Sequence, residues 1–343
     1  MKTFAFALMI CFTAMVGCGG ETSQTTGTSS STSGGDAGAG GAGGSSGTGG
    51  SGGAPNAAPV HVVLFTHIED NTPAGMLGSL ESRQGYNNLR SKLVDMAKLA
   101  QTHQLPWTLQ PDWKILEAAR LYEDMQTMAS TNGKNVFRYL HEDLNVAIDP
   151  HSHENGGYNY TDVAHLLTLL EVGGSTVIGG HVWDPALPQF QEWDRYRMPV
   201  NGIKYPSAQW RGDILIGAGT PNHVNDPLVS GAWRPKDRNN YFVDDPAANI
   251  LAFGAWHNEV TGVQELVDLR ANGTIAPDVI LTASWNIQPT DIMAPNGLAQ
   301  IESSTFVPIA KLRDAGSIIV TDFTSSAKTF ADQYGSKAFL YQP

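Results

Sequence analysis

Two histidines separated by one residue are the clearest sign of chemistry in this sequence. His151 and His153 flank Ser152, and on an extended chain such side chains point to the same side. Two imidazoles placed in this way can share one metal ion if a carboxylate from a neighbouring strand joins them. Asp70 is the natural third ligand. A mixed set of histidine and carboxylate ligands with open positions suits Zn²⁺ or a related divalent ion.

Glu69 stands directly before Asp70, so two carboxylates can divide the work. Asp70 would hold the metal, while Glu69 would accept a proton from water whose pKa the metal lowers toward about 7. Adjacent side chains on a strand point in opposite directions, so this division requires the chain to bend at Glu69. The alternative is that one of the two is a solvated turn residue or a helix N-cap.

The elements that must position these side chains alternate between strands and helices. Apolar and β-branched runs predict seven strands, at residues 60–66, 107–110, 145–149, 175–179, 213–216, 278–284 and 317–321. Helical spacing of apolar residues predicts helices at 86–103, 113–128, 136–142, 161–170, 259–272, 302–315 and 325–334. Residues 186–210 show no clear period and indicate a long loop or insertion. This order predicts an α/β fold, a (β/α) barrel of about seven parallel strands that is incomplete or distorted.

In such a barrel the carboxyl ends of the strands meet on one face, and active sites lie there. Polar residues gather just beyond the predicted strand ends, and they include His67, Glu69, Asp70, His151, His153, Asn155, His181 and His223. We therefore expect side chains that are distant in sequence to meet at one site. For His181 or His223 taken alone, a core or loop histidine is the commoner explanation.

The order of these motifs resembles that of the polysaccharide deacetylases, the NodB-like esterases. Residues 66–70 (THIED) look like the first motif of that family, with Glu69 where the base stands and Asp70 in the metal position. His151-Ser152 looks like the start of the second motif, His-Ser/Thr-x-x-His, which supplies two metal ligands. Residues 231–235 (GAWRP) are similar to the third, which would let Arg234 orient the base. The likeness spans roughly residues 60–290 and implies a metal-dependent deacetylase on a β/α barrel.

Three departures from the family pattern affect what the resemblance implies. Glu69 replaces an aspartate, and the second histidine of the family falls on Asn155 while the extra histidine stands at 153. The late motif of the family carries a catalytic histidine, but residues 283–286 (ASWN) offer none. We expect His181, or else His223, to protonate the leaving amine in its place. The alternative for Arg234 is a surface ion pair.

The first residues read as an export signal that ends at a cysteine. Lys2 is followed by an apolar run over residues 4–16, which is shorter than the about 20 residues of a membrane span. The run closes on Gly17-Cys18 and resembles the bacterial lipobox. We therefore expect residues 1–18 to be a lipoprotein signal peptide and Cys18 to carry lipid. The alternative is a plain signal peptide with an incidental cysteine.

The composition changes sharply after Cys18. Residues 19–58 are almost entirely Gly, Ser, Thr and Ala, which predicts a disordered linker, and residues 59–343 suit one large domain. We expect export across the inner membrane and a lipid anchor at the outer membrane or cell surface of the bacterial envelope. The two cysteines of the chain are Cys11 and Cys18, so the domain has no thiolate for a metal site or a nucleophile.

The charge of the chain bears on its partners. There are 33 Asp and Glu residues against 21 Lys and Arg, a net charge of −12, which argues against nucleic acid as a partner. Five tryptophans lie in or near predicted loops, where one or two could stack on sugar rings while the others pack the loops: Trp183, Trp193, Trp210, Trp233 and Trp256. We expect a monomer that acts on a carbohydrate polymer.

Three functions compete on these grounds. The first is a metal-dependent hydrolase, with Zn²⁺ as the expected ion, that removes acetyl groups from an envelope or extracellular polysaccharide. The second is a metal-independent glycosidase on a related barrel, using Glu69 and another carboxylate at a strand end. The third is a non-catalytic lipoprotein that binds glycan, which the missing late histidine favours. Chelation separates the first two, because a glycosidase of the second kind would survive it.

Overall fold

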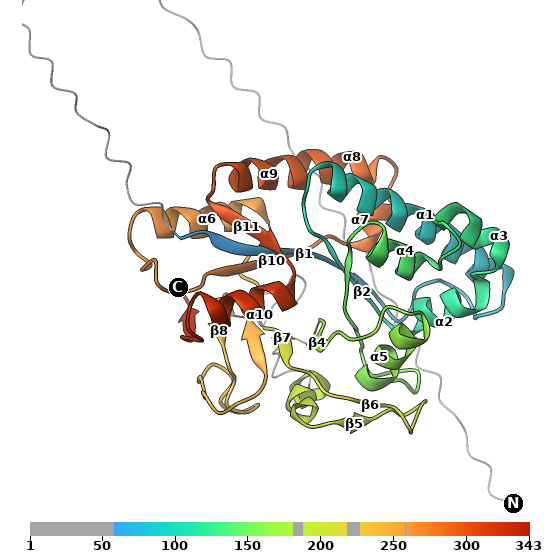
Figure 1. Ribbon diagram of the computed structural model, residues 1–343, viewed down its shortest axis with the longest axis horizontal. Coiled ribbons are helices and arrows are strands. Elements are labelled where there is room, and N and C mark those ends of the chain that lie inside the picture. Colours follow the sequence, from blue (N-terminus) through green and yellow to red (C-terminus); the bar gives the residue numbers. More distant parts are fainter. Residues whose placement is uncertain (1–57, 181–187, 218–226, 258) are drawn as a thin grey trace, which may run out of the picture. The chain divides into compact units, whose positions relative to one another are not determined.

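The computed structural model of the protein describes residues 58–180, 188–217, 227–257 and 259–343 (Figure 1). The predicted signal peptide, its Cys18 and almost all of the predicted linker lie outside these ranges, as do His181 and His223. Within them, no helix combines the length and the apolar character that crossing a membrane requires.

The first sheet is built around β1 (Val60–Ile68), and all of its strand pairs are parallel. One edge of β1 pairs with β10 (Thr282–Asn286). The other edge pairs first with β11 (Ile318–Thr321) and then, toward its carboxyl end, with β2 (Thr108–Pro111). β2 pairs in turn with β3 (Ala147–Ile148). Figure 1 shows β1 running between β10 and β2 through this sheet.

The second sheet has the order β12-β8-β9-β7-β4 and mixes directions. β4 (Val177–Ile178), β7 (Ile214–Ile216) and β9 (Leu251–Phe253) are parallel to one another. β8 (Ser230–Trp233) and β12 (Phe339–Tyr341) complete the sheet through antiparallel pairs. A separate antiparallel pair, β5 (Val200–Asn201) and β6 (Gln209–Trp210), lies within the predicted loop 186–210.

The two sheets meet at two seams. A single parallel bridge joins His151, beyond β3, to Gly179, beyond β4. At the other seam the amide of Ser284 in β10 donates to the carbonyl of Ala255, beyond β9, at 3.0 Å. The parallel strands therefore follow one another in the order β1, β2, β3, β4, β7, β9 and β10, and no continuous strand ladder crosses either seam in the described residues. This confirms the predicted α/β fold with an incomplete barrel, since the described residues form no continuous closed sheet.

Helices follow most of the parallel strands and cover the outer face of the first sheet. Their bounds are α1 (Leu80–Thr102), α2 (Trp113–Tyr122), α3 (Met125–Met128), α4 (Val136–Glu142), α5 (Tyr160–Leu169), α6 (Val260–Ala271), α7 (Pro289–Met293), α8 (Gly297–Ile301), α9 (Val307–Asp314) and α10 (Phe323–Asp332). Two 3₁₀ segments, η1 (Ala129–Thr131) and η2 (Pro188–Arg197), add to these, and a π-helical turn, η3 (Glu302–Phe306), joins α8 to α9. In Figure 1, α1, α8 and α9 lie along one side of β1.

β1 is buried along its whole length because both of its faces pack against apolar side chains. Val62 and Leu64 point into the core shared with the helices. Val63 and Phe65 point to the other side, into a core that includes Phe253 of β9 and Phe323 of α10. A strand covered on both faces reads as a continuous apolar run, which is why the sequence predicted it well.

The interior face of β1 begins with a buried histidine, which gives the fold a predicted pH dependence. His61 is 2% exposed, neither of its ring nitrogens has a hydrogen-bond partner in the described part of the chain, and it packs edge-on against Tyr334 at 5.9 Å. Burial, and then the charge of Arg270, lower its pKa from 6.5 to about 4. At a pH between about 4 and 6.5, His61 binds a proton in the unfolded chain but not in the folded chain. Stability therefore falls as the pH falls from about 6.5 toward 4.

We expect His61→Leu to reduce this dependence. Urea unfolding at pH 7 and pH 5 should show the wild type losing about 2 kcal/mol more than the variant over this interval. Carboxylates elsewhere affect both proteins equally, so the difference between them reports His61. The same loss of stability in both proteins would contradict the burial of a neutral imidazole at this position.

Candidate metal centre

The carboxyl end of β1 places two carboxylates in one turn. β1 ends at Ile68, and the amide of Thr72 donates to the carbonyl of Glu69 at 3.0 Å, which closes a turn over residues 69–72. The side chains of Glu69 and Asp70 therefore do not alternate as they would on a strand. Both reach His153, with oxygen-to-nitrogen distances of 3.2 Å and 3.9 Å respectively. The bend that the sequence required at Glu69 is present.

The two histidines of the HxH motif face the same carboxylate. Nε2 of His151 lies 3.0 Å from Oε2 of Glu69, and Nε2 of His153 lies 3.2 Å from the same oxygen. The two rings are nearly perpendicular, with centroids 5.0 Å apart and an interplanar angle of 71°. Imidazole lone pairs lie in the ring plane, so rings set in this way can aim at one point. Three possible metal-ligand atoms, two imidazole nitrogens and one carboxylate oxygen, therefore converge beside β1.

The outward nitrogen of each ring has an acceptor within reach. Nδ1 of His151 donates to the carbonyl of Gly179 at 2.9 Å, and Nδ1 of His153 faces Oδ1 of Asp70 at 3.9 Å. A histidine that ligates a metal commonly gives its other N–H to a carbonyl or a carboxylate, which fixes the tautomer. For His151 this leaves Nε2 as the ligand atom, whereas 3.9 Å is longer than a hydrogen bond, and for His153 it is the 3.2 Å approach of Nε2 to Glu69 that favours the same atom. Since His151 offers one nitrogen only, the cluster can hold a single ion.

His67 joins this cluster as a stacked ring. Its centroid lies 4.2 Å from that of His151 with an interplanar angle of 15°. The lone pairs of two stacked rings lie in nearly parallel planes, so these rings are poorly placed to share one ion, although His67 is close enough to be grouped with Glu69 and His151. Nε2 of His67 is buried and has no hydrogen-bond partner in the described ranges. We interpret His67 as the ring that packs His151 in place.

Asp112 is a carboxylate of the cluster that sequence reasoning missed. It follows β2 directly, as Glu69 follows β1, and it is fully buried. Its two oxygens accept hydrogen bonds from the amides of Trp113 at 2.5 Å and His153 at 3.2 Å. Together with His151 and His153 it forms a second set of groups close enough to surround one ion. Its place at a strand end was the only signal in the sequence.

The donor set fits a divalent metal ion. His67, Glu69 and His151 form one group whose possible ligand atoms all lie within 4.8 Å of one another, and Asp112, His151 and His153 form the other. Two imidazole nitrogens and one carboxylate oxygen suit ions such as Zn²⁺. His151 is buried, whereas the side chains of Glu69 and His153 are 36% and 35% exposed. The cluster is therefore rigid on one side and open to a small molecule on the other.

The electrostatics of the cluster favour a cation between these groups. Burial alone would raise the pKa of Glu69, but the hydrogen bond to His151 and the charges of the neighbouring histidines outweigh it and lower this pKa to about 2. Burial and the adjacent His151 hold the pKa of His67 well below its usual value. Burial also raises the pKa of Asp112 to about 6. Burial would lower the pKa of His151, but the hydrogen bond to Glu69 and the charge of Glu69 outweigh it and raise this pKa. The ionised carboxylate therefore favours a proton on His151, and a metal ion bound between the two would take the place of that proton.

The remaining predicted site residues take different places. Asn155 donates from Nδ2 to Oδ2 of Asp70, so it belongs to the rim of the cluster. Arg234 forms an ion pair with Asp244, with Nη2 to Oδ2 at 2.9 Å, as in the surface ion-pair alternative. The positions of His181, His223 and Cys18 lie outside the described residues, so their roles stay predictions.

Most of the tryptophans that could have stacked on sugar rings pack the fold instead. Trp193, Trp233 and Trp256 are at most 1% exposed and belong to the core. Trp210 is half-buried, stacks on Tyr160 and donates to the carbonyl of Ser175 at 2.9 Å. Trp183 lies outside the described residues. A position in or near a predicted loop therefore did not distinguish tryptophans at the surface from tryptophans that pack the loops against the sheets.

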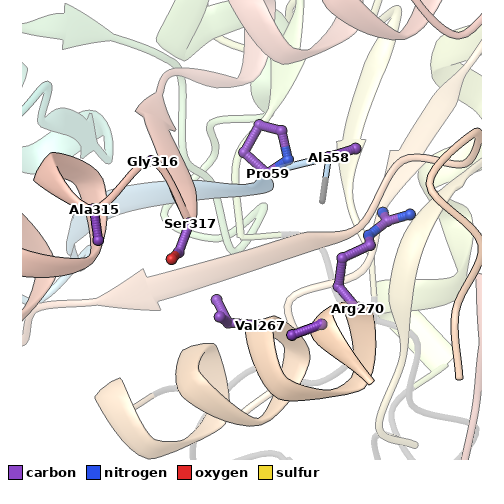
Figure 2. A pocket seen from close by; sticks show the side chains of 8 residues that line it. Ala58, Pro59, Val267, Arg270, Ala315, Gly316 and Ser317 are labelled. Carbon is purple, nitrogen blue, oxygen red and sulfur yellow. The ribbon is translucent and has the colours of Figure 1, made fainter. Parts of the chain in front are cut away.

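A pocket of about 400 Å³ lies away from this cluster, at the N-terminal ends of β1 and β11. Figure 2 shows Pro59, Ser317 and Arg270 around it. Among the described residues, neither a histidine nor a carboxylate lines it. The pocket therefore lacks a ligand set for a metal ion, and in β/α barrels this end of the strands serves stability rather than catalysis.

Comparisons with known proteins found similarity among solved structures, and none among protein-family models or curated proteins. Among solved structures the chain is similar to Puue allantoinase, at 13% identity and a TM-score of 0.49, covering 81% of this chain and 92% of that one.

Two further solved structures are similar to the chain. One is a probable polysaccharide deacetylase from Pseudomonas aeruginosa PAO1, at 12% identity and a TM-score of 0.45, covering 81% of this chain and 92% of that one. The other is a 4-alpha-glucanotransferase from Thermococcus litoralis, at 10% identity and a TM-score of 0.46, covering 83% of this chain and 42% of that one. The chemistry of the site rests on the residues themselves.

Gly180 gives a test of the imidazole packing. It adopts φ +75°, and a Cβ there would collide with Nδ1 of His151 and lie 2.7 Å from Cε1 of His67. We expect Gly180→Ala to weaken Zn²⁺ binding by about 10- to 100-fold, as loss of an outer contact to a ligand does, and isothermal titration would measure this. Gly273→Ala is the control, because φ there is +78°, no atom lies within 4 Å of the new Cβ, and the residue belongs to the turn after α6 and not to the segment that carries His153. Equal affinities in the two variants would mean that the rings do not need this space.

Proposed function

We propose that this protein is a metal-dependent hydrolase that removes acetyl groups from a carbohydrate polymer. The observation that supports it most is the convergence of Nε2 of His151 and Nε2 of His153 on Oε2 of Glu69, at 3.0 Å and 3.2 Å. The motif order that resembles the polysaccharide deacetylases supports the choice of reaction. Zn²⁺ is the ion that we propose, because the donor set is nitrogen-rich and mixed with one carboxylate.

The chain would use its residues as follows. Glu69, His151 and His153 hold the ion, which supplies a Lewis acid for the acyl carbonyl and lowers the pKa of water. Asp70 stands beside His153 with a side chain that is 19% exposed, within reach of solvent at the rim. We propose that Asp70 takes the proton from the attacking water and that Asn155 holds its carboxylate in place. This exchanges the roles that the motif alone gave to Glu69 and Asp70.

The acid that protonates the leaving amine is proposed to be His181, with His223 as the alternative. The late strand β10 offers Asn286 where the family pattern has a histidine, so a residue from another loop is required. We further propose that Cys18 carries the lipid anchor, that residues 19–58 serve as the linker in the cell envelope, and that the domain acts as a monomer. These proposals rest on the sequence.

Metal analysis combined with an activity assay tests the proposed function. We expect the purified protein to contain about one divalent ion per chain, as a single set of donors implies. It should release acetate from acetylated sugar oligomers, lose this activity on chelation and regain it with Zn²⁺. Cleavage of glycosidic bonds that survives chelation would support the glycosidase instead. Measurable glycan affinity without any turnover would support the binding protein.

A further inference from the structure

The first turn of α2 contacts the loop that begins with the proposed ligand His153 and runs over residues 153–158. No sequence motif predicts these contacts. Asp112, the N-cap of α2, accepts a hydrogen bond from the amide of Trp113 through Oδ1 and another from the amide of His153 through Oδ2. The carboxylate is fully buried and both of its oxygens are engaged. The backbone of a proposed ligand is therefore tied to the start of a helix.

Trp113 extends this attachment to the rest of the loop. Its ring stacks on Tyr158, with centroids 4.6 Å apart and an interplanar angle of 4°, and a Cβ on Gly156 would lie 2.8 Å from its Cζ2. Its indole nitrogen donates to Oδ1 of Asn155 at 3.3 Å, and Asn155 in turn donates to Asp70. The tryptophan thus packs the segment 155–158 and reaches the second carboxylate of the rim.

One turn later, α2 contacts the same loop again. Oε1 of Glu117 accepts a hydrogen bond from the hydroxyl of Tyr158 at 3.1 Å. Residues 112, 113 and 117 thus hold residues 153–158 at three points. A loop with glycines at 156 and 157, both at positive φ, has little rigidity of its own. Its shape must come from the surface on which it packs.

We infer that Asp112 and Trp113 are positioning residues that hold His153 in the geometry needed for metal binding and keep Asp70 beside it. This inference rests on the proposed metal centre and deepens it. Asp112 acts through the His153 amide, and Trp113 acts through Tyr158 and Asn155. Neither residue is a metal ligand in this arrangement, although the Asp112 carboxylate lies close enough to His151 and His153 for the three to surround one ion.

Variants of Asp112 separate positioning from folding. We expect Asp112→Ala to raise the Kd for Zn²⁺ by about 10- to 100-fold, the effect typical of an outer-shell partner. Asp112→Ser keeps a helix-capping oxygen but cannot serve the His153 amide as well, so it should recover the melting temperature and not the affinity. Asp322→Ala is the control, because Asp322 caps α10, a helix of the same ten residues, without contacting the cluster. It should lower the melting temperature and leave the Kd unchanged.

Variants of Trp113 test the second contact. Trp113→Phe retains a ring that can stack on Tyr158, so its Kd should stay close to that of the wild type. Trp113→Ala removes the stack and should raise the Kd by about 10-fold. If the two variants bind Zn²⁺ equally well, the stack does not position the ligands and this part of the inference is wrong.

Co²⁺ in place of Zn²⁺ distinguishes a positioning residue from a ligand. We expect the visible spectrum of Co²⁺-loaded Asp112→Ser to keep the wild-type band positions at saturating metal, because its ligands are the same. Shifted bands would make Asp112 a ligand and overturn the inference, as would a wild-type Kd in both folded Asp112 variants. If the wild-type protein binds neither ion, the proposed function itself fails, which is a separate result from either of these.

Discussion

Replacing His151 by alanine is expected to abolish metal binding and, with it, hydrolysis. The imidazole is 1% exposed, its Nε2 faces Glu69 and its Nδ1 is fixed by the carbonyl of Gly179. Loss of a ligand should cost more than the about 10- to 100-fold in affinity that loss of an outer-shell partner costs. Metal content of the purified variant, measured by plasma mass spectrometry, is the direct readout.

His141→Ala is the matched control for this variant. Nδ1 of His141 also bonds a backbone carbonyl, that of Val146 at 3.0 Å, but the residue has no place in the cluster. Its loss should leave the metal content at the wild-type level. Full metal loading of His151→Ala would refute the proposed centre, and depletion in both variants would point to a general loss of structure.

A second large effect is expected when each of the two carboxylates of the turn is replaced, in separate variants, by the corresponding amide. Glu69→Gln should lose metal, because the neutral amide is a poor ligand and Oε2 of Glu69 is the atom on which both histidines converge. Asp70→Asn should keep the metal and lower kcat by about 10²- to 10⁴-fold, the usual contribution of a general base. Metal content and steady-state kinetics on the same preparations would show the difference.

The opposite outcome is as informative. Metal loss in Asp70→Asn together with a slow but metal-loaded Glu69→Gln would return the two residues to the roles that the motif suggests. Loss of metal in both variants would mean that the two carboxylates ligate together. In each case the metal content, which is measured without a substrate, shows which carboxylate is a ligand.

The fold was largely predictable because its central strands are apolar runs without interruption. The predicted strands at 60–66, 175–179 and 213–216 correspond to β1, β4 and β7, whose described residues are buried. β8 and β9 were missed, since Ser230–Trp233 begins with Ser and Gly and Leu251–Phe253 has only three residues. Neither is long enough for a period to show. Pairing between strands, not local pattern, makes them strands.

The site was predictable in its location and less so in its roles. Strand ends on one barrel face brought Glu69, Asp70, His151 and His153 together as expected. Whether Glu69 or Asp70 contacts both histidines depends on how the chain turns after Ile68. A shift of this turn by one residue would exchange the two carboxylates. Asp112 has no motif around it, so its contact with the His153 amide could be seen only in three dimensions.

β1 also sets the distance between the candidate ligand atoms and the point at which the described chain enters the domain. The described chain enters this strand at Pro59, and the candidate donors follow at Glu69, so a single strand of nine residues separates the two. At about 3.3 Å per residue this is a rod of roughly 30 Å. The candidate ligand atoms therefore lie at the opposite end of that rod from the point at which the described chain enters the strand. A substitution at Val60 or His61 would reach them only through the packing of the strand itself.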